Sequence, residues 1–171
     1  INEWLANQIA KYMNLPIPHA RLVSLPHTLL PIPDDTTVIK TKTQFASAYF
    51  EGKNAHETTI EHVENGWQLA SVIVFDYWLY NRDRTRKNVI IEQREERQTL
   101  WIIDHADICG CSAWTVEQLK QLPQTIIDSK THRMMASFTT VEQFEQAIAI
   151  IQTMPTLLIE EMMKHMPEDW D

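Results

Sequence analysis

The stretch Asn81-Arg82-Asp83-Arg84-Thr85-Arg86-Lys87-Asn88 constrains this chain more than any other part of its sequence. It is polar and basic, and it directly follows residues 66–79, which are apolar nearly all round. An apolar run of that kind is typical of a helix buried in a core. A buried helix that ends in a polar loop is a common way for a rigid scaffold to position reactive side chains.

A hairpin is predicted directly after this loop. Two short β-rich runs cover residues 89–92 and 100–103, and the charged segment 93–98 separates them, a pattern that indicates two strands joined by a longer loop. Because a hairpin brings its outer strand ends together, we expect Asn88 and Asp104 to be neighbours.

Asp83, Asn88 and Asp104 offer the side chains that phosphoryl transfer from ATP requires. One carboxylate positions and deprotonates the attacking hydroxyl, while an amide and a second carboxylate hold the magnesium ions. The sequence assigns these roles to Asp83, Asn88 and Asp104 in that order, with Asp107 as an alternative to Asp104. We expect Asp104 to be buried beside apolar Ile103, where a carboxylate needs a partner charge or a metal.

The same residues resemble a known family. The chain reads Phe75-Asp76-Tyr77-Trp78-Leu79-Tyr80-Asn81-Arg82-Asp83-Arg84, then Asn88, then Ile103-Asp104-His105. This order of residues is similar to the catalytic loop and metal-binding Asp of HipA-like kinases and, more remotely, of the phosphatidylinositol-kinase-like group. The resemblance implies that Asp83 is the catalytic base, that Asn88 and Asp104 are magnesium ligands, and that Asn81 supports the loop around the nucleotide. Arg84, directly after the base, is assigned to the catalytic set with Asp83, to support either a phosphate or the Asp83 loop. His105 is expected to pack and hydrogen-bond beside Asp104 and is given no chemistry.

A second likeness lies at the start of the chain, in Asn2-Glu3-Trp4-Leu5-Ala6-Asn7-Gln8-Ile9-Ala10 and then Leu15-Pro16-Ile17-Pro18. In the family, the Glu of this helix pairs with the ATP-binding Lys of an earlier strand, and Glu3 is the matching residue. The resemblance also places residues 39–43 near the adenine, with Lys40 as a nucleotide-binding residue.

The chain departs from the family pattern in two respects. Its three glycines, Gly52, Gly66 and Gly110, form no glycine-rich phosphate loop, and no strand carrying a Lys precedes Glu3. We therefore expect a protein-kinase-like α+β fold whose N-terminal lobe is largely missing. Residues 1–43 would be a remnant of that lobe and residues 44–171 a mostly helical catalytic C-terminal lobe with short antiparallel strands, so this chain alone is expected to be incomplete as an enzyme.

The resemblance further implies a serine/threonine-protein kinase that uses ATP and Mg²⁺, with a protein Ser or Thr hydroxyl as acceptor. It implies a cytoplasmic, toxin–antitoxin type of setting, with an antitoxin or a separate N-terminal-lobe chain as a partner. The alternatives are a pseudokinase that serves as a binding or regulatory module, and a small-molecule or lipid kinase on the same scaffold. A metal-hydrolase interpretation is disfavoured because His56 and His62 belong to no dense ligand motif.

The composition agrees with these expectations. The 171 residues are 44% hydrophobic and 22% charged, which suits one globular domain with a real core. The net charge of −8 argues against direct nucleic-acid or anionic-membrane binding, and no apolar run approaches 18 residues. Cys109 and Cys111 are expected to be reduced thiols, because one intervening residue rarely allows a disulfide.

The remaining elements are predicted from periodicity, caps and prolines. Helices are expected over residues 1–14, from Thr115 as a capped start, and over residues 123–135, 140–153 and 155–166. Strands are expected over residues 21–25 and 37–42, and a loop with a short helix over residues 45–54.

Overall fold

A computed structural model describes residues 1–26, 42–125, 127 and 129–170 of the chain. The described helices and 3-10 turns are α1 (Asn2–Tyr12), η2 (Gly66–Gln68), α2 (Leu69–Trp78), η3 (Arg86–Asn88), η4 (Ile108–Gly110), α3 (Val116–Lys120), α4 (Lys130–Ala136), α5 (Val141–Gln152) and α6 (Thr156–Lys164). The described strands are β1 (Ala20–Ser24), β2 (Thr43–Ser47), β3 (Lys53–Asn54), β4 (Val89–Arg94) and β5 (Arg97–Ile102).

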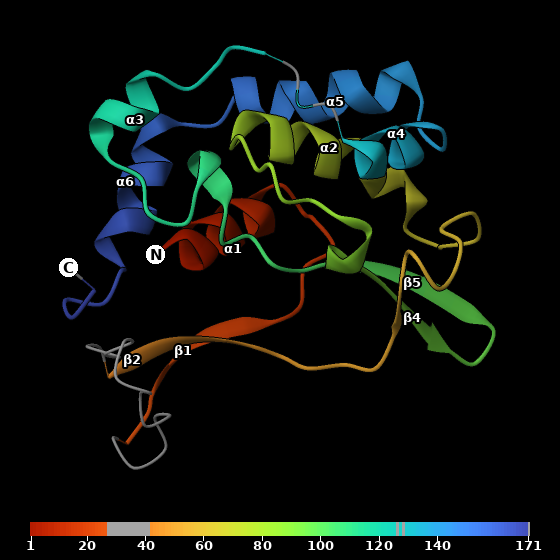
Figure 1. The fold of residues 1–171 in the computed structure, drawn as a ribbon, viewed down its shortest axis with the longest axis horizontal. Coiled ribbons are helices and arrows are strands. Elements are labelled where there is room, and N and C mark those ends of the chain that lie inside the picture. Colours follow the sequence, from red (N-terminus) through yellow and green to blue (C-terminus); the bar gives the residue numbers. More distant parts are fainter. Residues whose placement is uncertain (27–41, 126, 128, 171) are drawn as a thin grey trace.

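The helices form one side of the molecule and two small antiparallel sheets lie on the other (Figure 1). β1 pairs with β2, from Ala20 opposite Ser47 to Ser24 opposite Thr43. The second sheet has the order β3-β4-β5. This mixture of helices and antiparallel strands is the α+β class that the sequence predicts. None of the described helices is long and apolar enough to cross a membrane.

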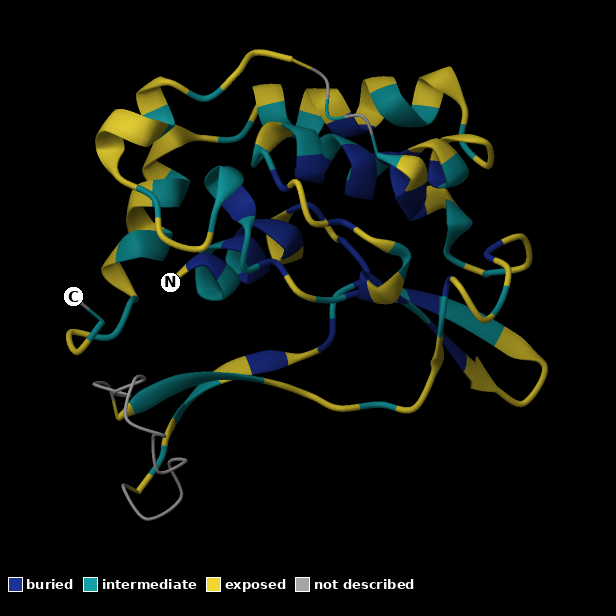
Figure 2. Ribbon diagram, in the orientation of Figure 1, coloured by how far each residue is buried: buried dark blue, intermediate teal, exposed yellow. Residues whose placement is uncertain are grey.

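The core lies between α1, α2 and the inner face of the β4–β5 hairpin (Figure 2). Its fully buried members include Ile9 from α1, Phe75 from α2, and Leu100 and Ile102 from β5. The helix predicted over residues 66–79 is confirmed as a 3-10 turn followed by α2, whose central apolar side chains are almost completely buried. This burial fixes the point at which the polar loop after α2 begins.

The hairpin is tighter than the sequence predicts. β4 and β5 pair without a break from Val89 opposite Ile102 to Arg94 opposite Arg97, so only Glu95 and Glu96 form the turn. Glu95 has a positive φ of 53°, as a two-residue hairpin turn requires. The expectation of a longer loop over residues 93–98 was wrong, because polar side chains on a two-stranded extension that projects into solvent do not prevent pairing.

Two further expectations were wrong. Residues 45–54 contain most of β2 and all of β3 rather than a short helix. The helix predicted over residues 123–135 begins only at Lys130, where the Ser129 hydroxyl accepts hydrogen bonds from the first free amides. The strand predicted over residues 37–42 lies almost wholly outside the described residues, as does Lys40, while Lys42 is described as a bend.

Other helix ends follow the sequence closely. The predicted start at Thr115 is confirmed as a full capping box with Gln118, and Thr140 caps α5 in the same way with Gln143. Not every apolar side chain of these helices faces the core, since Tyr12 of α1 and Ile148 of α5 are exposed.

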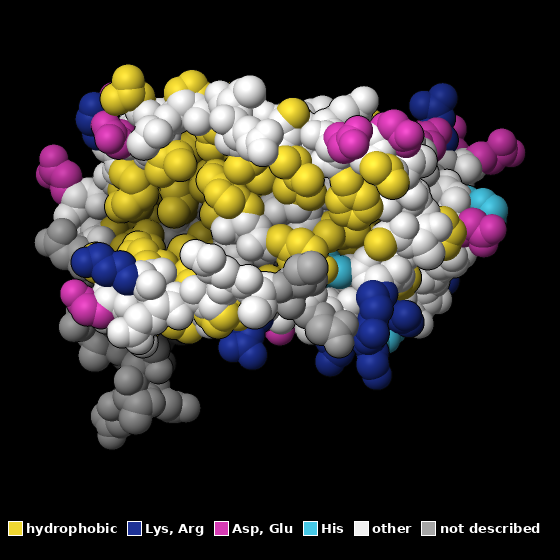
Figure 3. All heavy atoms as spheres, turned by 90° about the horizontal axis from the view of Figure 1, so that it is seen from above, with side chains coloured by type: hydrophobic (Ala, Val, Ile, Leu, Met, Phe, Trp, Pro, Cys, Tyr) yellow, Lys and Arg dark blue, Asp and Glu magenta, His cyan; other side chains and the backbone are white. Residues whose placement is uncertain are grey.

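Apolar side chains are numerous on the helical face of the molecule (Figure 3). Exposed members on α3, α5 and α6 are Val116, Val141, Ile148 and Leu157.

The C-terminal segment reaches back to the first sheet. The Asp169 carboxylate accepts hydrogen bonds from the main-chain amides of Lys42 at 2.9 Å and Thr43 at 3.0 Å. The indole of Trp170 donates to the carbonyl oxygen of Thr43 at 2.8 Å. These contacts attach the beginning of β2 to the end of the described chain.

Candidate active site

The loop after α2 is held in place by Asn81. Its side chain is fully buried and donates to the Asp76 carboxylate at 2.9 Å, while its own oxygen accepts from the amide of Asp83 at 3.2 Å. Both ends of the Asn81 amide are therefore used inside the protein. This arrangement suits the loop-supporting role that the sequence suggests.

Asp83 and Asn88 are joined across the loop. The Nδ2 group of Asn88 donates to the main-chain oxygen of Asp83 at 2.8 Å, and the amide of Thr85 donates to the same oxygen at 2.7 Å. The Asp83 carboxylate is exposed to solvent. Because Nδ2 is committed, Asn88 has its Oδ1 atom left as an acceptor, and no described residue donates a hydrogen bond to it.

Asn88 and Asp104 are brought together as the hairpin predicts. Val89 lies opposite Ile102, and the amide of Ile103 donates to the carbonyl oxygen of Asn88 at 3.1 Å. Asp104 is the next residue, so its backbone starts directly beside Asn88. It has a positive φ of 59°, an uncommon conformation for a residue other than glycine.

Asp104 is exposed rather than buried, so the expectation that it is buried was wrong. The strand ends at Ile102, and Asp104 itself adopts a left-handed backbone conformation with its side chain exposed, while the next residue, His105, is buried again. No described residue forms a hydrogen bond or ion pair with the Asp104 side chain. The carboxylate therefore remains available to a ligand.

Glu3 binds the segment that follows Asp104. Its Oε1 accepts from the amide of His105 at 2.6 Å, and its Oε2 lies 3.5 Å from the His105 ring nitrogen Nδ1. Partial burial by itself raises the pKa of Glu3, but the hydrogen bonds and charge of His105, with a smaller contribution from Arg84, outweigh burial and lower that pKa below its usual value. His105 is buried and its ring meets that of Phe75 edge-on at 5.7 Å, which agrees with a packing role.

Asn2 adds a contact that the sequence analysis missed. Its Nδ2 group donates to the carbonyl oxygens of Ala106 at 2.6 Å and Cys111 at 3.1 Å, and its Oδ1 accepts from the Trp114 indole at 2.8 Å. The first turn of α1 is thereby fixed to the chain beyond Asp104. Cys109 and Cys111 in this segment are free thiols, as predicted, and burial raises the pKa of Cys109.

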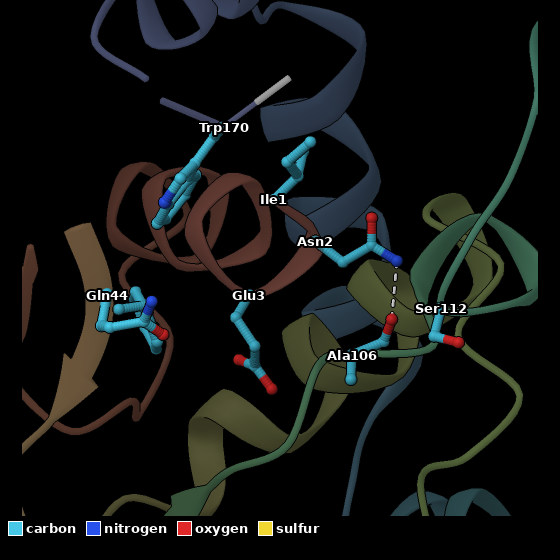
Figure 4. Close-up of a pocket in the computed structure, with 8 residues that line it drawn as sticks. Ile1, Asn2, Glu3, Gln44, Ala106, Ser112 and Trp170 are labelled. Atoms are coloured by element: carbon cyan, nitrogen blue, oxygen red, sulfur yellow. Dashed lines mark hydrogen bonds between the residues drawn. The ribbon is translucent and has the colours of Figure 1, made fainter. Parts of the chain in front are cut away.

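Three cavities surround these residues. One of about 270 Å³ is lined by Glu3, Ser47 and Asp104 among others, and one of about 390 Å³ is lined by Asp83 and Asp107. Asp83 and Asp104 therefore open onto different cavities. A third, of about 480 Å³, lies beside the start of α1, with Glu3, Ala106 and Trp170 on its wall (Figure 4).

The Asn88–Asp104 pair fits a magnesium ion better than a metal held by protein ligands alone. Within the described residues, no group of three or more His, Cys, Asp or Glu side chains forms a metal cluster. Mg²⁺ characteristically takes one or two protein oxygen ligands, substrate phosphates and water. Asn88 Oδ1 and the Asp104 carboxylate are oxygen donors of this kind on adjacent backbone segments, whereas His56 and His62 are exposed and take part in no such cluster.

Arg84 lies inside the protein rather than in a cavity. Its side chain has no exposed surface and pairs with the equally buried Asp76, Nε to Oδ2 at 2.9 Å. Of the two roles left open for Arg84, the geometry favours support of the loop. Among its basic neighbours on the loop, Arg82 and Lys87 are exposed and Arg86 is partly buried.

Asp76 and His132 are site residues that the sequence analysis missed. His132 lies in α4, and its Nε2 atom is 2.8 Å from Oδ2 of Asp76. The signal for Asp76 was present, because a charged side chain in the middle of an otherwise apolar helix requires a buried partner. Nothing in the sequence pattern marks His132 as that partner.

A family model described as HipA-like kinase matches residues 1–171, the whole chain. The chain therefore belongs to the HipA-like kinase family. The resemblance carried by the catalytic loop and the first helix is thus confirmed over the full length. No curated protein and no solved structure matches the chain.

Proposed function

We propose that this protein is an ATP- and Mg²⁺-dependent phosphotransferase that transfers the γ-phosphoryl group to a Ser or Thr hydroxyl of a protein. Family membership supports a kinase in general. The observation that carries the finer assignment is the arrangement of Asn88, whose Nδ2 is bound to Asp83 and whose carbonyl is bound to Ile103. That arrangement leaves the Asn88 amide oxygen without a hydrogen-bond donor among the described residues, one residue across the strand pair from the uncommitted Asp104 carboxylate.

Each residue has a defined task in this proposal. The exposed Asp83 carboxylate accepts the proton of the attacking hydroxyl from the cavity that it lines. Asn88 Oδ1 and Asp104 hold the cation, which neutralises charge on the phosphate oxygens when it is bound. Glu3 holds the backbone of His105 and thereby keeps the Asp104 segment against α1.

The nucleotide is proposed to enter the cavity between Glu3, Ser47 and Asp104, because this cavity reaches both the proposed metal ligand and the strand β2. Lys40 stays a predicted nucleotide-binding residue, as it lies outside the described residues. We propose the two-lobe division as well, but with the first unit extended through Ser47, because β2 pairs with β1 along its whole length.

The test uses the full-length protein, Mg-ATP and a generic Ser/Thr protein acceptor, with intact mass as the readout. We expect added phosphate with the wild type and none with Asp83→Asn. Lys87→Gln is the matched control, because it changes another exposed side chain of the same loop and should retain activity. Asp107→Asn tests the carboxylate that the sequence offers in place of Asp104 as a metal ligand; it lines the same cavity as Asp83 and should also retain activity.

The other outcomes are equally informative. Equal phosphate in the wild type and Asp83→Asn would refute the role of Asp83 as the base. ATP binding without transfer in any variant would favour the pseudokinase alternative. Transfer to a small molecule or lipid but to no protein would change the acceptor class while keeping the chemistry.

A further inference from the structure

One guanidinium group connects the two strand ends that carry the proposed metal ligands. The Nη1 atom of Arg84 donates to the carbonyl oxygen of Ile103 at 2.7 Å and, more weakly, to that of Asn88 at 3.4 Å. Ile103 precedes Asp104, and Asn88 carries the other ligand atom. The position of Arg84 therefore bears on the spacing between Asn88 Oδ1 and the Asp104 carboxylate.

Asp76 fixes the orientation of this guanidinium. Its two oxygens accept from Nε at 2.9 Å and Nη2 at 3.1 Å, a two-point contact that holds the plane of the group. Burial by itself raises the pKa of Asp76, but the charge of Arg84 and the hydrogen bond with His132 outweigh burial and lower that pKa. The carboxylate is therefore present in its accepting, ionised form.

His132 brings a third element to the same carboxylate. It lies in α4, 56 residues from Asp76 in sequence, and its Nε2 carries the hydrogen in the bond to the accepting Asp76 oxygen. Its ring packs edge-on against Tyr77 at 5.2 Å, and its exposed fraction is only 2%. The hydroxyl of Ser129, just before α4, donates to the carbonyl oxygen of Arg84 at 3.4 Å.

We propose that Asp76 and His132 are positioning residues that act through Arg84 and determine the affinity of the Asn88–Asp104 pair for a divalent cation. None of their polar atoms needs to touch the cation or the nucleotide. Packing of α4 becomes coupled to the metal site, because His132 is the contact between α4 and Asp76. The catalytic meaning of this coupling rests on the proposed function, whereas its effect on cation binding can be measured independently.

The experiment measures Mn²⁺ affinity in the full-length protein by electron paramagnetic resonance, with and without ATP. The key pair is His132→Gln and His132→Asn, because a Gln amide can place an N–H where Nε2 lies and the shorter Asn cannot. Substitution of residues that orient metal ligands typically lowers metal affinity by about 10- to 100-fold. We expect Asn to weaken Mn²⁺ binding by about tenfold or more and Gln to stay within about threefold of the wild type.

Glu92→Gln is the control for a purely structural effect. Glu92 is 8% exposed and binds Arg94 at 2.8 Å and the Trp101 indole at 3.0 Å, in the hairpin but away from its open end. We expect this variant to lose stability in urea unfolding and to keep its Mn²⁺ affinity. His132→Asn with unchanged Mn²⁺ affinity and lowered stability would show a structural role only and would overturn the proposal.

Failure of the proposed function gives a different pattern. A wild type that binds Mn²⁺ but transfers no phosphate to any acceptor would refute the kinase assignment, and the His132 comparison would still decide the positioning role. A wild type that binds no Mn²⁺ even with ATP would overturn the positioning proposal itself.

Discussion

The substitution Asp76→Asn tests how much of the fold depends on the buried ion pair. The Asp76 carboxylate is fully buried and accepts four hydrogen bonds, two from Arg84 and one each from Asn81 and His132. Asn keeps the shape of the side chain but replaces one accepting oxygen with a donating NH₂ group. That group would face N–H donors, and the charge of Arg84 would lose its counter-ion inside the protein.

The expected loss of unfolding free energy follows from this geometry. Removing one partner of a buried pair typically costs about 3–5 kcal/mol. For a chain of this length each kcal/mol lowers the melting temperature by about 2–4 °C, so the midpoint should fall by about 6–20 °C. We would measure urea unfolding at low temperature and thermal unfolding, both by circular dichroism.

The control is Glu161→Gln, which removes the exposed pair between Glu161 and Lys164. Their side chains are 55% and 66% exposed, and such pairs contribute at most about 1 kcal/mol. If Asp76→Asn and Glu161→Gln differ by less than about 1 kcal/mol, the reasoning about the buried pair is refuted. The double variant Asp76→Leu/Arg84→Leu provides a second check, because removing both charges should cost less than leaving Arg84 unpaired.

Three further predictions concern single positions. The left-handed backbone of Asp104 disfavours Ala by about 1 kcal/mol relative to Gly. Asp104→Ala should therefore be less stable than Asp104→Gly in urea unfolding, although both variants should lose Mn²⁺ binding. Equal stability of the two variants would contradict this. The pKa of Glu3 is lowered in the folded state, so its stabilising contribution should be complete above about pH 4.5 and lost as pH falls through the lowered pKa. The difference in unfolding free energy between wild type and Glu3→Gln should therefore shrink only at such acidic pH. A difference that shrinks near neutral pH would contradict this prediction. A Cβ atom at Gly52 would lie 2.5 Å from Ile90 Cγ2 and 2.8 Å from a main-chain oxygen, whereas at Gly66 the nearest atom is 3.8 Å away. Gly52→Ala should therefore lose about 1–3 kcal/mol of unfolding free energy, and Gly66→Ala should be tolerated. Similar urea midpoints for both variants would contradict this prediction.

The parts of the site that the sequence predicts are those fixed by local patterns. The loop after α2 follows from an apolar run that ends at a polar one, and the meeting of Asn88 with Asp104 follows from hairpin pairing alone. The capped start at Thr115 follows from a four-residue motif. In each case the deciding interaction lies within a few residues or across one turn.

The parts that could not be predicted depend on contacts between distant elements or on local backbone geometry that the apolar pattern does not specify. His132 is connected to Asp76 by packing of α4 against α2, which no spacing in the sequence records. The late start of α4 has a local origin, because the Ser129 cap, rather than the proline that precedes it by several residues, determines where the helix begins. The exposure of Asp104 follows from a left-handed backbone turn that its apolar neighbour Ile103 gave no reason to expect.

The contact of Asp169 and Trp170 with the beginning of β2 has a consequence for biosynthesis. It joins residues 126 and 127 positions apart, so it closes a long loop whose entropic cost grows only slowly with length. During translation β1 and β2 can pair early, but this anchor on β2 can form only after residues 169–170 have left the ribosome. A stalled or prematurely terminated chain would therefore hold the loop after α2 and its hairpin while the sheet beside the proposed nucleotide cavity still lacked one of its attachments.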